Sequence, residues 1–167
     1  GETEASSCWF PTIDKPNERM TQNIAITVKE EFVTLSNGLL IKSEKNGDGT
    51  RTDYWEQKLA HAPYLAMLGV GDFNITSDKW KDIEVDYYLE DEYQPFARAI
   101  FGRTPQMIAH FSEILGVEYP WQKYAQIIVR DFVSGAMENT TAVIYGEFVQ
   151  MTERELLDDH EEDIIAH

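Results

Sequence analysis

The feature that most constrains the fold of this chain is a turn sequence, Asn-Gly-Asp-Gly at residues 46–49, between two stretches with strand character, 39–43 and 52–59. Asn, Asp and Gly accept the positive φ angles that tight hairpin turns require. The pattern therefore predicts an antiparallel β-hairpin. Further apolar or alternating runs of strand length occur at residues 24–28, 64–70 and 83–89. The sequence up to residue 91 is accordingly predicted to be β-structure.

The chain changes character after three acidic residues at 90–92. Phe96, Ile100 and Phe101 then share one face of a helical pattern. Thr104 is typical of an N-cap and Pro105 of a first helical turn, so they predict a second helix, which ends at Gly116. The apolar stripe predicted for that helix consists of Ile108, Phe111, Ile114 and Leu115.

Two more strands are predicted at residues 124–129 and 141–145, on either side of residues 135–139. Thr152 and Glu155 form a capping-box pattern, which predicts a helix that continues through Leu156 and Leu157. Strands followed by a mixture of helices and strands indicate an α+β fold.

Composition limits the partners that this chain can have. With 43% hydrophobic and 12% aromatic residues, its 167 residues can bury a core and form a soluble globular protein. A net charge of −16 argues against nucleic acid or an anionic membrane as partner and modestly favours cationic ligands, including peptide N-termini. Cys8 is the single cysteine, which excludes an internal disulfide, and no apolar run predicts a membrane span. These features leave the cellular compartment open.

Residues 135–139 read Gly-Ala-Met-Glu-Asn, a set of side chains suited to binding the N-terminus of a peptide. A free α-ammonium group has a pKa of about 8, so it is largely protonated at neutral pH, and the carboxylate of Glu138 matches its charge. Gly135 and Ala136 have almost no side chain and allow a peptide backbone to pair beside them as an added strand. Met137 offers an adaptable apolar wall to the first side chain, and Asn139 is suited to holding the loop by hydrogen bonds.

The same five residues form the exopeptidase signature of zinc aminopeptidases related to aminopeptidase N. Residues 8–16 resemble that family's Phe-Pro-Cys-x-Asp-Glu-Pro segment, with Thr12 and Lys15 in place of the usual cysteine and acid. Segments at 35–37, 70–73 and 116–120 are also similar to family segments, in the same order. The resemblance covers essentially the whole chain, and it includes the leukotriene-hydrolase branch of the family.

This resemblance implies a fold and an activity. Residues 1–91 would be the later half of an all-β, saddle-like N-terminal domain. Residues 92–167 would open a thermolysin-like catalytic domain whose edge strand carries residues 135–139. The implied activity is that of a zinc-dependent aminopeptidase, which removes N-terminal residues from peptides by metal-activated water.

The resemblance also assigns two residues near the chain ends. His167 falls on the first histidine of the family's His-Glu-x-x-His zinc motif, and Glu2 on the final acid of its Gln-x-Glu motif. Glu2 and Glu138 would together bind the ammonium group of the substrate. His61, His110 and His160 match no ligand spacing and are predicted to be surface or packing residues.

The resemblance places the rest of the zinc motif, with the general base, after His167. It therefore implies that this chain alone is an inactive fragment with little or no affinity for zinc. Truncated domains leave apolar faces bare, so we also expect the fragment to self-associate.

Two alternatives are open at this point. The first is a non-catalytic peptide-binding homologue. The residues that follow His167 separate it from an enzyme, because the enzyme needs a glutamate next and a histidine four positions on. The second is a β-rich interaction module in which residues 135–139 form an ordinary polar turn. That module would show no coupling between the loop and N-terminal amines.

Overall fold

A computed structural model describes residues 5–158 and 161–167 of this chain. The chain forms two compact units. The first runs up to Asp72 and includes the later segment Glu138–Ala142, and the second comprises Phe73–Met137 and Val143–His167. The first unit is mostly strands and the second combines strands with helices, so the predicted α+β fold is confirmed.

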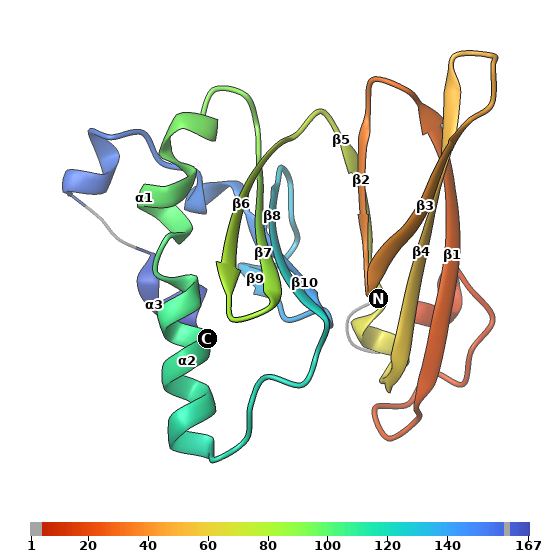
Figure 1. The fold of residues 1–167 in the computed structure, drawn as a ribbon, viewed down its shortest axis with the longest axis horizontal. Helices are drawn as coiled ribbons and strands as arrows, with labels where there is room; N and C mark the ends of the chain where they lie inside the picture. Colours follow the sequence, from red (N-terminus) through yellow and green to blue (C-terminus); the bar gives the residue numbers. More distant parts are fainter. Residues whose placement is uncertain (1–4, 159–160) are drawn as a thin grey trace. The chain divides into compact units, whose positions relative to one another are not determined.

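The first unit contains two small antiparallel sheets (Figure 1). One has the order β1-β4-β3, with β1 at Met20–Lys29, β4 at Thr50–His61 and β3 at Leu39–Lys45. In the other, β2 (Val33–Ser36) pairs with β5 (Leu68–Gly71). The turn at residues 46–49 joins β3 to β4, and its glycines, Gly47 and Gly49, have φ angles of 82° and 84°. The predicted hairpin is therefore present, with positive φ where the sequence offers glycine.

One predicted strand of the first unit is partly wrong. Residues 64–70 do not form a single strand, because Pro63–Leu65 make a 3₁₀ turn and β5 begins only at Leu68. Proline fixes φ near the helical value and lacks the N–H that a strand ladder uses, so it favours the turn. A second 3₁₀ turn, Ser6–Cys8, lies near the start of the described chain.

A buried polar cluster ties β2 to β4. The Trp55 indole N–H donates to Thr34 Oγ1 at 3.0 Å, and the Thr34 hydroxyl donates to Asp53 Oδ2 at 2.7 Å. Burial acts to raise the pKa of Asp53, but hydrogen bonds from Arg51, Ser43 and Thr34 outweigh it and lower the pKa below its ordinary value. Asp53 is thus an ionised, fully hydrogen-bonded buried carboxylate, the form in which burial is tolerated.

His61, at the end of β4, supports a prediction about pH. Its side chain is 2% exposed, and neither ring nitrogen has a hydrogen-bond partner among the described residues. Burial lowers the pKa of His61 to about 4 from 6.5, so the folded protein keeps it neutral while the unfolded chain protonates it. Its stabilising contribution is complete above pH 6.5 and is lost as the pH falls toward 4. We expect the free energy of unfolding to be about 2 kcal/mol lower at pH 5 than at pH 7.

Denaturant unfolding at the two pH values measures this effect. A His61→Gln variant should lose most of the difference, whereas His110→Gln, at an exposed position, should keep it. Equal pH dependence in the His61 variant and the wild type would contradict the assignment.

The second unit is built on a five-stranded sheet with the order β6-β7-β8-β10-β9 (Figure 1). Its strands are β6 (Asn74–Trp80), β7 (Ile83–Leu89), β8 (Lys123–Val129), β10 (Ala142–Gly146) and β9 (Ala136–Met137). β7 and β8 are parallel, and the connection between them carries 3₁₀ turn Gln94–Phe96 and helices α1 (Ala97–Phe101) and α2 (Thr104–Leu115). After β10 follow 3₁₀ turns Glu147–Val149 and Glu155–Leu157 and helix α3 (Glu162–Ala166).

β7 has the bounds that the sequence predicts. It pairs with β6 and with β8 inside the second unit. Alternation of apolar and polar residues identifies a strand, but it does not say which sheet the strand joins. β2 and β6 were not predicted, whereas β9 lies at the sheet edge, where the resemblance places residues 135–139.

The helix ends were predicted with mixed success. Gly116 ends α2 with a φ of 66°, as predicted. The N-cap position is Arg103 and not Thr104, whose hydroxyl donates instead to Gln126 Oε1 at 2.7 Å. The capping-box bonds between Thr152 and Glu155 are present, but they open only a 3₁₀ turn.

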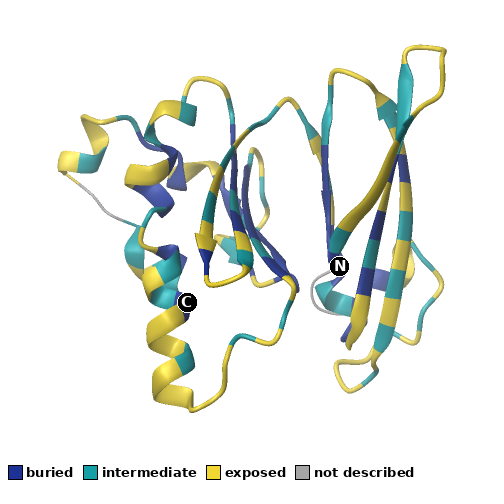
Figure 2. Ribbon diagram, viewed as in Figure 1, coloured by how far each residue is buried: buried dark blue, intermediate teal, exposed yellow. Residues whose placement is uncertain are grey.

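The core of the second unit lies between the sheet and its helices. Phe101 of α1 is fully buried, and its ring centroid lies 5.5 Å from those of Tyr87 and Tyr145 on the sheet. The end of α2 is different, because Figure 2 shows it as largely exposed. Ile114 and Leu115 in this part are 60% and 71% exposed. This bare apolar face agrees with the predicted self-association, which stays a prediction. Among the described residues, no helix is both long and apolar enough to cross a bilayer.

Candidate functional site

The Gly-Ala-Met-Glu-Asn segment begins on the edge strand of the five-stranded sheet. Ala136 and Met137 form β9, which pairs with Tyr145 and Ile144 of β10, and the Gly146 N–H donates to Gly135 O at 3.0 Å. β9 comes last in the strand order, so its other side has no strand partner among the described residues. An edge of this kind presents backbone N–H and C=O groups to an extended peptide.

Gly135 allows the helix that carries His167 to approach this strand. A Cβ atom at Gly135 would lie 3.1 Å from Ile164 Cδ1 of α3, tighter than an ordinary contact. Ile164 lies about one helical turn before His167. Within the second unit, Gly135 and α3, the helix directly before His167, are therefore packed together.

A chain of buried hydrogen bonds also holds α3 against the sheet. Gln126 Nε2 on β8 donates to the Tyr145 hydroxyl at 3.0 Å, and that hydroxyl donates to Ile165 O at 3.4 Å. Burial raises the pKa of Tyr145 well above its ordinary value, which keeps the hydroxyl protonated as a donor. The sequence gives no signal for this chain of contacts, because its members come from three separate elements.

The remaining part of the segment belongs to the first unit. Glu138 is exposed, and no ion pair to its carboxylate is found among the residues that the structure describes. Asn139 is 3% exposed, and its Nδ2 donates to Leu65 O at 3.2 Å. Met137, on the second unit, is 5% exposed. Glu138 is thus the one charged side chain of the segment and is open to solvent, while its neighbours on both sides are packed.

The sequence did not identify the residue that anchors this part of the segment. Asn37, in the turn between β2 and β3, is fully buried, and its Nδ2 donates to Thr140 O at 2.6 Å. The Gly38 N–H donates to Thr141 Oγ1 at 2.8 Å. The available signal was an Asn-Gly pair between two strands, which predicts a turn but not what that turn contacts.

His167, the predicted zinc ligand, is exposed and follows α3, where its N–H donates to Asp163 O at 3.0 Å. Zinc sites need a tetrahedral set of donors. No cluster of three His, Cys, Asp or Glu side chains suited to a metal occurs within residues 5–158 and 161–167. The described residues therefore show no zinc site, and the assignment of His167 as a zinc ligand stays a prediction.

Two other predicted residues, Glu2 and His160, lie outside the described residues. The pairing of Glu2 with Glu138 thus stays a prediction. Of the histidines predicted to be packing or surface residues, His61 is buried and His110 is exposed.

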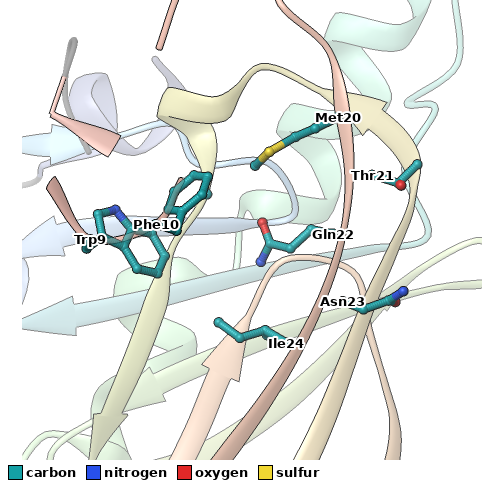
Figure 3. Close-up of a pocket in the computed structure, with 8 residues that line it drawn as sticks. Trp9, Phe10, Met20, Thr21, Gln22, Asn23 and Ile24 are labelled. Atoms are coloured by element: carbon teal, nitrogen blue, oxygen red, sulfur yellow. The ribbon is translucent and has the colours of Figure 1, made fainter. Parts of the chain in front are cut away.

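The first unit also has a cavity of about 250 Å³ beside β1 (Figure 3). Its lining includes Trp9, Phe10, Met20, Gln22 and Ile24, and no charged side chain contributes to it among the described residues. The described lining thus supplies no carboxylate to balance an ammonium group. The exposed Glu138, and not this cavity, is therefore the candidate for binding an N-terminal amine.

Comparison with known families gives two matches in the expected order. Residues 1–65 match the Peptidase M1 N-terminal domain, and residues 100–167 match the Peptidase family M1 domain. This chain belongs to the M1 peptidase family. The second match contains residues 135–139 and His167. The unmatched residues 66–99 contain the predicted boundary at 91/92, which stays a prediction, and also the division between the compact units at Asp72.

Individual relatives of this M1 family chain agree with the match. Human glutamyl aminopeptidase is 29% identical over 141 residues, which cover 83% of this chain and 14% of that protein. Aminopeptidase M1 of Arabidopsis thaliana is 32% identical over 148 residues, which cover 86% of this chain and 16% of that protein. The tricorn protease-interacting factor F2 of Thermoplasma volcanium is 27% identical over 151 residues, covering 90% and 19%. The chain thus spans less than a fifth of the length of these relatives.

Proposed function

We propose that this chain is part of a zinc-dependent aminopeptidase, in which it supplies the surface that binds the N-terminus of a peptide. The substrate backbone pairs with the free side of β9, and its ammonium group is bound by Glu138, together with Glu2. His167 supplies one zinc donor. The remaining donors and the general base are contributed by residues beyond those present here, so the chain alone is expected to be inactive.

The observation that carries this proposal is the juxtaposition of an open strand edge with an exposed acid. Residues 136–137 form the edge strand, and the next residue in the chain is Glu138. Backbone pairing fixes the direction of an extended peptide, while the carboxylate selects the end that carries a free amine. An exopeptidase needs both features, because it must place the first peptide bond after the free N-terminus at the reacting centre.

Hydrolysis by the protein at its natural length tests the proposal. We expect release of the first residue from peptides with a free N-terminus and none from the same peptides after N-acetylation. A chelator should abolish the release, and added zinc should restore it.

Internal cleavage, or equal cleavage of the acetylated peptides, would contradict an exopeptidase. Binding of free-amine peptides without any hydrolysis would instead support the non-catalytic homologue.

A further inference from the structure

In the turn between β2 and β3, the side-chain amide of Asn37 makes three hydrogen bonds to the backbone of other segments. Asn37 is fully buried, and its amide oxygen accepts from the Met67 N–H at 2.8 Å. Its amide nitrogen donates to Leu65 O at 3.0 Å and to Thr140 O at 2.6 Å. Both kinds of polar atom in this amide are therefore satisfied, and one of its bonds reaches a residue 103 positions later.

The neighbouring residue, Gly38, contributes a second bond from a rigid position. Its φ is 76°, and a Cβ atom here would lie 1.9 Å from Glu56 O of β4. Only glycine allows the turn to lie this close to β4. The Gly38 N–H, which donates to Thr141 Oγ1 at 2.8 Å, is held in place by that packing.

The acceptor of this bond is in a strained conformation. Thr141 is a β-branched residue with a φ of 66°, and its side chain is only 3% exposed. Such a conformation costs about 1–3 kcal/mol and persists only where the surroundings impose it. The Gly38 N–H bonds the Thr141 hydroxyl, and Asn37 bonds the carbonyl of the preceding residue, Thr140.

We propose that the Asn37–Gly38 turn is a positioning device for Glu138: it holds Thr140 and the strained Thr141 in place and so fixes the position of the carboxylate. This inference rests on the proposed function. Glu138 is exposed and makes no ion pair among the described residues, so its own contacts do not fix it. Its position depends on the backbone on both sides of it, of which the turn holds the part that follows. A displacement of about 1 Å at a recognition group can cost on the order of 100-fold in rate.

The test measures how strongly the protein at its natural length prefers an amine. A competitive inhibitor with a free α-amine is compared with its des-amino analogue, and the ratio of their affinities reports the contribution of the ammonium site. We expect Thr141→Val, which keeps the branched shape but removes the acceptor, to lower this ratio about tenfold or more. Thr141→Ser keeps the hydroxyl and should retain the ratio within about twofold. Asn37→Ala should act like Thr141→Val.

Two further measurements separate positioning from loss of structure. Thr34→Val removes a buried hydrogen bond to Asp53 in the same unit without touching residues 139–141, and it should leave the ratio unchanged. Amide hydrogen exchange at Ala142, whose N–H donates to Asn139 O, should become faster in Asn37→Ala and Thr141→Val but not in Thr34→Val.

The outcomes distinguish this inference from the proposed function. A wild-type ratio near one would refute the proposed function, and with it the role given to the turn. Suppose instead that the wild type strongly prefers the inhibitor with the free amine. The positioning role alone would be overturned if Thr141→Val left this affinity ratio unchanged, or if Thr34→Val lowered it as much as Thr141→Val does. If Asn37→Ala fails to fold, the comparison of Thr141→Val with Thr141→Ser still tests the positioning role.

Discussion

Replacing Glu138 by Gln should lower kcat/KM for free-amine peptides by about 10-fold to 150-fold in the protein at its natural length. Gln keeps the size of the side chain but removes the charge, and each hydrogen bond to a charged group contributes about 1.5–3 kcal/mol. Because Glu138 is exposed, the substitution should leave the free energy of unfolding unchanged within about 0.5 kcal/mol. Steady-state kinetics and denaturant unfolding of the same preparation measure both quantities.

Glu113 provides a matched control for charge. It is an exposed glutamate on α2 in the second unit. Glu113→Gln makes the same change in net charge and should alter kcat/KM by less than about twofold. If both variants lose activity equally, the loss is due to the change in net charge and not to a specific contact between Glu138 and the substrate. If neither does, residues 135–139 act as an ordinary turn.

The second large effect is expected for Gly38→Ala, on stability. The new Cβ would lie 1.9 Å from Glu56 O, and φ at this position is 76°. Positive φ costs an L-residue about 1–2 kcal/mol, and overpacking adds about 1–3 kcal/mol. We therefore expect a loss of about 3 kcal/mol or more in the free energy of unfolding, measured by denaturant titration.

Gly47 separates the two contributions. Its φ is 82°, but a Cβ atom there would have no neighbour within 4 Å. Gly47→Ala should thus cost only the conformational part, about 1 kcal/mol. Similar losses in the two variants would contradict the close packing of the Asn37–Gly38 turn against β4.

Features set by local sequence could be predicted. The turn at residues 46–49 carries its own conformational preference, and Gly116 ends α2 because glycine accepts a positive φ. Residues 135–139 could be singled out because their chemistry is contained in five adjacent side chains. Membership of the M1 family followed from such segments, and the family matches confirm it.

Features set by distant contacts could not be predicted. Asn37 and Thr140 are 103 residues apart, and neither segment contains a sequence pattern that predicts their contact. Thr104 has the residue type of an N-cap, but its hydroxyl binds Gln126 because β8 lies within reach. The strain at Thr141 is invisible in the sequence, since threonine is typical of strands and rarely adopts positive φ.

The most direct test of the central claim is a crystal structure of the protein at its natural length with a bound, non-hydrolysable peptide analogue that has a free N-terminus. The proposal predicts that the ammonium nitrogen lies about 2.7–3.2 Å from a carboxylate oxygen of Glu138, with the peptide backbone paired to Ala136 and Met137. A peptide bound with its N-terminus away from Glu138, or with no backbone pairing to β9, would contradict it.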